Sequence, residues 1–489
     1  MRQIHIGWII ASACGGLVLG IELCRWSAWR GITPACLILP GVLLLVISVI
    51  SRAKIIIPMA VFGGLLLGVV RGRGAIVLTE TAWQKVIGDT VMTTATIDDD
   101  PTLNKNNLTM PLDNIEINRI DNQEVNRPIS GKIWASLKDG AKLSGKLKRY
   151  DRITITGLVD SGFGSYNATM ARATLNKIER GVSVDPLGRL RGWFGAQLSK
   201  VMNADEAALG MGLVAGQKAN LSSQMKQAFT GASLTHILVA SGYNLTILVR
   251  FCRRLFAKKS RLIALISSLT LILLFSLMVG DSASMNRAVL VSVLSLLTWY
   301  VGRSIHPVVL LLLTSAITAM VEPSVIFGDV GWYLSFFSFA GVIILAPLLN
   351  DLINKRGNSL MQIMLETLAA TLLTVPIVAY FMGTVSLVGI ITSVLVLPII
   401  PLTMALAFLA GLAASVLPVA VADILALPAK LLLDYIILVA KWGASLPLSS
   451  IEYQPSLSFV IIYYLVFTIG VIILWRTIKH NFRGDNVVE

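Results

Sequence analysis

Long apolar runs recur along the chain and constrain its fold more than any other feature. They lie at positions 7–21, 35–50, 55–70, 232–249, 262–279, 285–301, 306–321, 331–349, 361–382, 385–417 and 456–475. A helix needs about 20 apolar residues to cross the hydrocarbon core of a bilayer, so these runs predict about ten to twelve membrane spans. Of the 489 residues, 55% are hydrophobic and 14% are charged, which exceeds the apolar content that a water-soluble fold can bury. We expect a polytopic α-helical membrane protein.

A long polar stretch interrupts these runs and predicts a separate β domain. Residues 79–183 alternate between polar and apolar side chains with a period of two, which is typical of half-buried strands. Five short strands of this kind favour a barrel resembling the OB fold. The strands that we predict are 91–97, 114–118, 131–137, 152–157 and 166–175.

The remaining sequence divides into helical segments around this inserted domain. We predict N-terminal transmembrane helices in residues 1–75, amphipathic or interfacial helices in 186–229, a transmembrane domain in 230–480 and a short tail in 481–489. The first apolar run lacks a convincing cleavage site and lies close to two further spans. We interpret it as a retained anchor.

The distribution of basic residues predicts the orientation in the membrane. The net charge is +14, and basic residues gather at 250–261, at 355–356 and after position 475. Loops rich in lysine and arginine face the cytoplasm as a rule. Counting spans from these loops gives a multi-pass protein of the plasma (inner) membrane, with cytoplasmic termini and an extracytoplasmic β domain.

The β domain also carries a basic cluster with two aromatic residues beside it. A positive groove lined with aromatic rings suits single-stranded nucleic acid. A solvated, lysine-rich loop explains the same residues, and the sequence leaves both interpretations open. The candidate DNA-binding residues are Trp134, Lys138, Lys142, Lys146, Lys148, Arg149, Tyr150 and Arg152.

Polar residues inside the apolar run 232–249 form the most informative local pattern. His236, Ser241, Gly242 and Asn244 lie within nine residues of one another. Hydrocarbon offers no partner to an unsatisfied polar group, so the pattern favours a broken or water-lined helix. The alternative is that these side chains only join neighbouring helices.

Three further polar residues are candidates for a membrane pathway. Ser335 and Glu366 lie inside apolar runs, and Arg287 enters another run at its start. Arginine in a membrane snorkels to the surface, pairs with an acid such as Asp281, or lines a hydrated path. Snorkelling is the more common of these outcomes.

Prolines and glycines predict the local geometry of several spans. Pro376 must open the hydrogen-bond ladder of its helix, and Pro398 with Pro401 favours a discontinuous or re-entrant segment. Glycine pairs spaced by four residues allow helices to approach closely. Such pairs occur at Gly16 and Gly20 and at Gly64 and Gly68.

Residues 230–249, TGASLTHILVASGYNLTILV, resemble the corresponding segment of the ComEC/Rec2 competence family. The likeness continues through 282–290, 331–347 and 365–402, and the order of helices, inserted β domain and long membrane domain also agrees. The residues that match the family pattern in the first segment are Thr230, Gly231, Leu234, His236, Ser241 and Gly242.

The resemblance implies an inner-membrane channel that translocates single-stranded DNA into the cytoplasm during natural transformation. Its implied partners are single-stranded DNA, the lipid bilayer, and the DNA-receptor and ATPase or helicase proteins of the uptake machinery. A homo-oligomer is left open. In this interpretation His236, Ser241, Gly242, Asn244, Arg287, Ser335 and Glu366 form the polar channel motif.

The chain also departs from the family pattern. Asn244 stands where the family commonly has a second histidine, and an amide cannot titrate as histidine does. Many members carry a metallo-β-lactamase-like domain at the C-terminus. The four histidines, His5, His236, His306 and His480, are too scattered for a two-metal cluster. We therefore expect no enzyme activity, metal or cofactor, and a nuclease supplied by another protein.

Two other functions compete with this interpretation. A transporter of another anionic substrate could use the same interior polar groups, although it would leave the β domain unexplained. An intramembrane serine hydrolase could use Ser241 as nucleophile and His236 as base. On a regular helix these two side chains would point roughly 140° apart, which opposes direct proton transfer.

Overall fold

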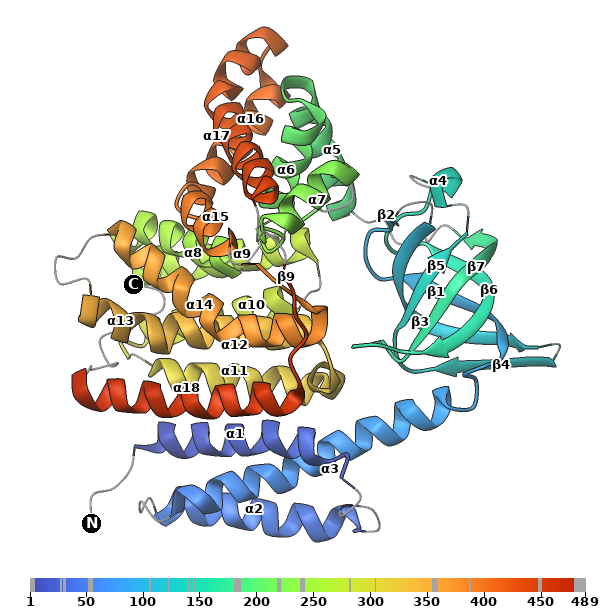
Figure 1. The fold of residues 1–489 in the computed structure, drawn as a ribbon, viewed down its shortest axis with the longest axis vertical. Coiled ribbons are helices and arrows are strands. Elements are labelled where there is room, and N and C mark those ends of the chain that lie inside the picture. Colours follow the sequence, from blue (N-terminus) through green and yellow to red (C-terminus); the bar gives the residue numbers. More distant parts are fainter. Residues whose placement is uncertain are drawn as a thin grey trace. The chain divides into compact units, whose positions relative to one another are not determined.

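The computed structural model contains two compact units. The first comprises the described residues up to Pro186 together with Ser315–Asp329, and the second comprises Leu187–Thr314 and the described residues from Val330 onward. Figure 1 shows the helices and strands of both. The structure describes residues 5–478 except 27–28, 30–31, 52–55, 105–106, 122, 139, 144–145, 165, 180–185, 218–220, 238–241, 281–282, 304, 354–358, 387 and 447–450.

Three helices begin the first unit: α1 (Ile6–Leu23), α2 (Pro34–Ser51) and α3 (Ile57–Trp83). Helices α1 and α3 touch through their main chains at the predicted glycine pairs. A Cβ atom added to Gly16 would lie 2.0 Å from the Val61 carbonyl oxygen, and one added to Gly64 would lie 2.0 Å from the Ala13 oxygen. The glycine pairs therefore do allow close helix packing, as predicted.

The β domain follows α3 and consists of β1 (Thr90–Ile97), β2 (Thr102–Asn104), β3 (Asn107–Ile120), β4 (Gln123–Ile129), β5 (Ile133–Leu137), β6 (Arg152–Ser161) and β7 (Ala168–Glu179). Five of these strands close a ring in the order β1, β3, β5, β7, β6 and back to β1. Only the β5 and β7 pair is parallel. A ring of five strands is what the predicted OB-like barrel requires.

The barrel core comes from the inward side of these strands. Val91, Leu112, Ile133 and Ile153 are almost completely buried. Trp83, at the end of α3, joins the same core and donates its indole N–H to the Ser130 carbonyl oxygen at 3.0 Å. The end of the helix therefore contributes directly to the barrel core.

The sequence predicted the five ring strands, although their bounds differ. The predicted strand 114–118 is the end of a much longer β3, while β2 and β4 were not predicted. Every residue of β4 except Ile129 is exposed. A strand that lacks a buried face does not show the alternation that identified the others.

The segment Ser315–Asp329 belongs to the first unit although the chain on both sides belongs to the second. It contains the end of α11 (Pro307–Val321) and the short helix η3 (Pro323–Phe327). Arg71 of α3 donates to the carbonyl oxygens of Met320 and Val321 at 2.9 and 3.1 Å. The Arg25 guanidinium lies 4.3 Å from the centre of the Phe327 ring. These cationic contacts hold the segment against α1 and α3.

The second unit is helical. Its elements are α5 (Pro186–Val201), α6 (Ala204–Ala215), α7 (Ser223–Gly231), α8 (Gly242–Ala257), α9 (Arg261–Val279), α10 (Ala283–Tyr300), α12 (Val330–Ala340), the π-helical turn η4 (Gly341–Leu345), α13 (Ala346–Ile353), α14 (Ser359–Met382), α15 (Val388–Val396), α16 (Ile400–Val416), α17 (Val419–Ser445) and α18 (Leu457–Ile478). A pair of two-residue strands, β8 (Thr384–Val385) and β9 (Ile451–Glu452), joins the regions before α15 and α18.

Clusters of buried side chains among the described residues hold this unit together. One joins α5, α6 and α7 to α15, α16 and α17, a second joins α8, α9 and α10, and a third joins α12, η4 and α13 to α14 and α18. Helix α6 is buried from Glu206 to Ala215. It therefore differs from the predicted interfacial helices of residues 186–229, because it is surrounded by protein.

The apolar helices confirm a polytopic membrane protein with an inserted β domain. Within the described residues, seven helices are long and apolar enough to cross a bilayer. The pair α15 and α16 forms an eighth candidate span, bent by 51° at the break that Pro398 and Pro401 predicted. The candidate spans are Ile6–Leu23, Pro34–Ser51, Ile57–Ile76, Arg261–Val279, Val330–Ile353, Met361–Met382 and Leu457–Ile478.

This number is lower than the ten to twelve spans predicted from apolar runs, and the difference lies in particular helices. The run 232–249 contains a break, and only its second part enters α8. Arg250, Arg253 and Arg254 make α8 too polar for a complete span, and α11 has only 15 residues. Hydropathy counts such runs although their helices are short or charged.

We predict that Gly68→Ala disrupts the packing of α1 against α3. The added methyl group would lie 2.1 Å from the Leu17 carbonyl oxygen, and the main chain cannot yield as a side chain can. We expect the free energy of unfolding to fall by about 1–3 kcal/mol, the usual effect of overpacking. Gly74→Ala in the same helix is the control, because nothing lies within 4 Å of its added methyl group. Thermal unfolding in detergent measures both; equal effects would contradict the assignment.

Candidate functional site

The predicted channel motif forms an interruption between two helices. Helix α7 ends at Gly231, the described residues 232–237 lie in turns, and α8 begins at Gly242. Ser241 lies outside the described residues. Ser233 has a positive φ of 57°, an uncommon conformation for a residue with a side chain. The described part of the apolar run is therefore not one continuous helix. We call α7, the turns at 232–237 and α8 together the interrupted helix.

Two neighbouring helices hold the start of this interruption. Thr392 of α15 donates its hydroxyl to the Ala232 carbonyl oxygen at 2.8 Å. A Cβ atom added to Gly389 of α15 would lie 2.6 Å from the Ser233 Cβ, and one added to Gly443 of α17 would lie 3.1 Å from the Ala232 Cβ. The fold around the motif thus requires small residues at both positions.

His236 and Asn244 have separate local partners. The His236 Nδ1 atom lies 3.1 Å from the Ser233 carbonyl oxygen, and the residue is exposed. Asn244 is only 2% exposed, and its amide donates weakly to the Leu213 carbonyl oxygen at 3.5 Å. Asn244 therefore links α8 to α6, a structural role that an uncharged amide can fill.

Arg287 occupies the most informative position in this unit. It projects from α10 and donates to the main-chain carbonyl of Ser335 in α12. Its guanidinium lies 5.1 Å from the centre of the Phe339 ring. A Cβ atom added to Gly242 would lie 2.9 Å from Arg287 Nη2, so this residue also lies beside the first turn of α8. The structure thus brings Gly242, Arg287 and Ser335 together.

No carboxylate in the described part of the chain forms an ion pair with Arg287. Asp281, the predicted acidic partner, lies outside the described residues. A guanidinium carries five N–H donors, and the donation to Ser335 uses only part of this capacity. Arg287 therefore keeps a positive charge and donors that no described acid neutralises.

Ser335 and Glu366 differ in the hydrogen bonds of their side chains. Ser335 is 7% exposed, and its hydroxyl has no hydrogen-bond partner among the residues described. Glu366 of α14 accepts from Gln362 of the same helix at 3.0 Å. The structure gives no contact of Glu366 with Arg287, so these two predicted pathway residues are not brought together.

Aromatic residues of α12 and α14 pack against one another, and the sequence did not identify them as a group. Trp332 packs on Phe336 with 4.7 Å between ring centres, and Tyr333 stacks on Phe381 of α14 at 6.2 Å. The signal in the sequence was the motif GWYLSFFSF. Its spacing alone does not show which rings face the second helix.

The predicted basic residues of the β domain differ in exposure and in their partners. Lys138, Lys146 and Lys148 are exposed in the β5 to β6 connection, which contains the one-turn helix α4 (Gly140–Leu143). The Lys142 side chain lies outside the described part of the structure. The Arg149 guanidinium stacks on Tyr150 at 4.9 Å, and Arg152 pairs with Glu116.

Trp134 packs with two aromatic residues from the connection between β6 and β7. Its ring centre lies 6.1 Å from Phe163 and 5.2 Å from Tyr166. We call these three residues the aromatic surface of the barrel. Phe163 is 54% exposed, although a large apolar ring usually seeks burial. The signal that could have found it is the sequence GFGSY, which places two rings in one connection between strands.

Charges around the aromatic surface are mixed. Lys132 pairs with Asp98 at 3.0 Å. Burial raises the pKa of the Tyr166 phenol to about 12, with Lys132 lowering it and Asp329, Asp98 and Asp99 raising it further. The phenol is therefore neutral at physiological pH and presents a ring with a polar tip.

No cluster of three or more possible metal ligands occurs within the described ranges.

We predict that Thr392→Val destabilises the interrupted helix while Thr392→Ser does not. Valine removes the hydroxyl donor of the buried Ala232 carbonyl, and an unsatisfied buried acceptor costs about 1–3 kcal/mol. Thermal unfolding in detergent measures the difference. A serine variant as unstable as the valine variant would show that packing of the methyl group, and not the hydrogen bond, is decisive.

A known protein family matches most of the second unit. The protein-family model described as "Competence protein" matches residues 213–477, more than half of the 489 residues. No curated protein and no solved structure matches the chain. The matched region includes the interrupted helix, Arg287, α12 and α14, which are the segments that carry the family resemblance in the sequence. The chain therefore belongs to the competence protein family, of the ComEC/Rec2 type.

Proposed function

We propose that this protein is the inner-membrane channel through which single-stranded DNA enters the cytoplasm during natural transformation. Membership of the competence family supports a role in DNA uptake. The apolar helices support a location in the membrane. The channel function is the more specific proposal, and it depends on the chemistry of the polar residues.

The observation that carries the proposal is the charge of Arg287. Its guanidinium is held by a main-chain carbonyl and an aromatic ring, and neither contact neutralises it. A cation among apolar helices is unfavourable unless it is hydrated or meets an anion. A passing phosphate can accept two parallel hydrogen bonds from a guanidinium. Arg287 is therefore suited to transient contact with a polyanion.

The interrupted helix provides the setting for this contact. Gly242 leaves space for the Arg287 guanidinium at the first turn of α8. Conduction needs contacts that are favourable enough for entry and weak enough for exit. A single arginine with unused N–H donors fits this requirement better than a tight cluster of cations would. We propose that Ser241 and His236 contribute further polar contacts along the same route.

The barrel supports the proposal through a second set of residues. We propose that it is an extracytoplasmic OB-like domain that receives DNA, with cytoplasmic N- and C-termini. Bases would stack on Trp134, Phe163 and Tyr166, while Lys146 and Lys148 would attract phosphates. Receptor, ATPase or helicase and nuclease activities would come from other proteins of the uptake machinery.

Arg287→Gln should block DNA internalisation in a naturally competent host. Glutamine keeps hydrogen bonding but removes the charge, so we expect transformants to fall at least about tenfold, equivalent to about 1.4 kcal/mol in the barrier. Arg287→Lys should retain intermediate uptake, because a lysine keeps the charge without the planar donor array. Labelled DNA that binds the surface but never reaches the cytoplasm is the decisive measurement.

Arg303→Gln is the matched control for that experiment. Arg303 follows α10 on the same part of the chain and is exposed. It should leave uptake unchanged once membrane insertion is confirmed. Normal internalisation in Arg287→Gln would overturn the proposed role of Arg287. Unchanged uptake in a complete gene deletion would overturn the channel itself and favour a transporter of another anion.

Two sets of barrel variants should weaken DNA binding in different ways. Trp134→Ala should lose about 1–3 kcal/mol of single-stranded DNA affinity at every salt concentration, as expected for a stacked base. Lys146→Gln with Lys148→Gln should instead reduce the salt dependence of binding, because fewer counterions are released. Titration of the full-length protein with fluorescent oligonucleotides distinguishes them. Equal affinity of Trp134→Ala and the unmodified protein would exclude the aromatic surface.

A further inference from the structure

Two tyrosines of α18 meet the part of α14 that its proline opens. Pro376 lies inside α14 and has no N–H group, so the carbonyl of Leu372, four residues earlier, loses its helical donor. The Tyr463 hydroxyl donates to this carbonyl oxygen at 2.9 Å. The Tyr464 hydroxyl donates to the next one, that of Leu373, at 2.6 Å.

The environment makes these two hydrogen bonds important. Within an apolar bundle, no water replaces a missing donor, and helices interrupted by proline persist where neighbouring groups satisfy the freed carbonyls. The two tyrosines are consecutive on α18, and their rings meet edge to face with 5.5 Å between centres. They therefore supply two donors to two consecutive carbonyl groups of another helix.

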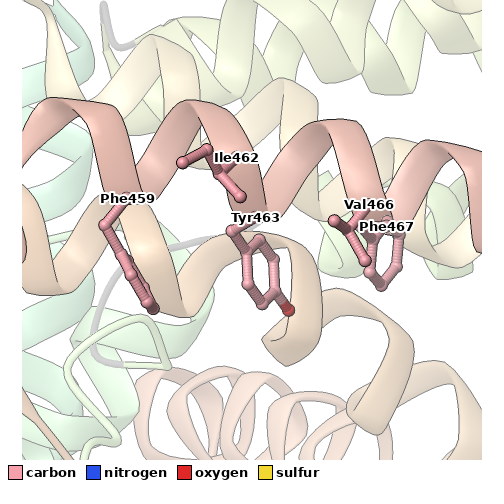
Figure 2. Close-up of a pocket in the computed structure, with 5 residues that line it drawn as sticks. All are labelled: Phe459, Ile462, Tyr463, Val466 and Phe467. Carbon is pink, nitrogen blue, oxygen red and sulfur yellow. The ribbon is translucent and has the colours of Figure 1, made fainter.

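Figure 2 shows Tyr463 between Phe459 and Phe467 on one face of α18, with its hydroxyl at the far end of the ring. This face forms an apolar groove of about 250 Å³, lined by Phe459, Ile462, Tyr463, Val466 and Phe467. Tyr463 stacks on Phe467 at 5.9 Å. Phenylalanine could line this groove equally well, so packing alone does not account for the hydroxyl at position 463.

The opened segment of α14 lies between two functional regions. Before Pro376, the helix carries Glu366. After it, Phe381 stacks on Tyr333 of α12, two residues before Ser335, whose carbonyl accepts from Arg287. Tyr464 also packs on Phe337 of α12 at 4.9 Å. Ring contacts therefore connect both α14 and α18 to α12, whose Ser335 carbonyl accepts from Arg287.

We propose that Tyr463 and Tyr464 are positioning residues that fix α14 at its proline opening and thereby align α12 with Arg287. In its link to transport, this inference rests on the proposed channel function. The structural part concerns only the donors that replace the missing N–H. Neither tyrosine touches the proposed DNA contact itself.

The test is a double-mutant cycle between Tyr463→Phe and Pro376→Ala. With Pro376 present, Tyr463→Phe leaves the Leu372 carbonyl without a donor, and we expect the thermal midpoint in detergent to fall by about 2–4 °C. With alanine at position 376, the helix supplies its own N–H to that carbonyl, and Tyr463→Phe should then have little effect. Pro376→Leu provides the same N–H if the alanine variant does not accumulate in the membrane.

Tyr453→Phe is the matched control. Its ring contacts Phe459, but its hydroxyl has no hydrogen bond within the described residues. This variant should keep the midpoint of the unmodified protein. If Tyr463→Phe lowers the midpoint equally with proline and with alanine at position 376, the inference is overturned, because the hydroxyl then acts independently of the proline.

DNA uptake by the same variants separates this inference from the proposed function. We expect the double variant Tyr463→Phe with Tyr464→Phe to lower uptake at least about tenfold, and Pro376→Ala to restore part of it. If Arg287→Gln blocks uptake while the tyrosine variants transport normally, the positioning role is wrong and the channel stands. If uptake is normal in every variant, the channel proposal fails, while the thermal cycle still decides whether the tyrosines replace the missing donor.

Discussion

Main-chain carbonyl groups at breaks and ends of apolar helices need hydrogen-bond donors, and the fold of both units depends on how this requirement is met. Arg71 supplies donors at the end of α11. Thr392 serves the turn after α7, and the two tyrosines of α18 serve α14. Each donor comes from an element far away in the sequence. Polar groups that would be unfavourable in a membrane if left unpaired are therefore also the groups that fix tertiary contacts.

Arg287 shows how the same requirement leads towards function. The donors from Thr392, Tyr463 and Tyr464 are neutral hydroxyls. Each has one O–H group, which the carbonyl contact uses. An arginine that performs the same task keeps a full charge and unused N–H groups. Its contact with the Ser335 carbonyl orients the guanidinium, which also lies over the Phe339 ring. The helical packing thus orients a cation without neutralising its charge, and the proposed channel function uses that charge.

Much of this architecture could be predicted from residue patterns because apolar runs and glycine spacing report directly on burial. The first three runs became α1, α2 and α3, and the glycine pairs of α1 and α3 lie at main-chain contacts. Pro398 and Pro401 marked the bent pair of helices. The ring strands of the barrel followed from alternation. The polar strand β4 was missed because it has almost no buried face.

The candidate site was less predictable because its partners are main-chain atoms. The sequence offered Asp281 as the partner of Arg287, yet the described acceptor is a carbonyl that any residue could provide. The sequence grouped Trp134 with the lysines that follow it and did not show which rings it meets. Its actual neighbours, Phe163 and Tyr166, come from a connection almost thirty residues later. Spacing along the chain does not reveal such encounters.

The segment Ser315–Asp329 has a consequence for modularity. It is continuous with the second unit at both ends, yet it packs with α1 and α3 through Arg25 and Arg71. The N-terminal half is therefore not a self-contained module that could be transplanted by a single cut in the gene. The barrel and its helices depend on Ser315–Asp329, a segment inside the region that matches the competence family, so the two must evolve together. Recombination between relatives should preserve these distant stretches as one block.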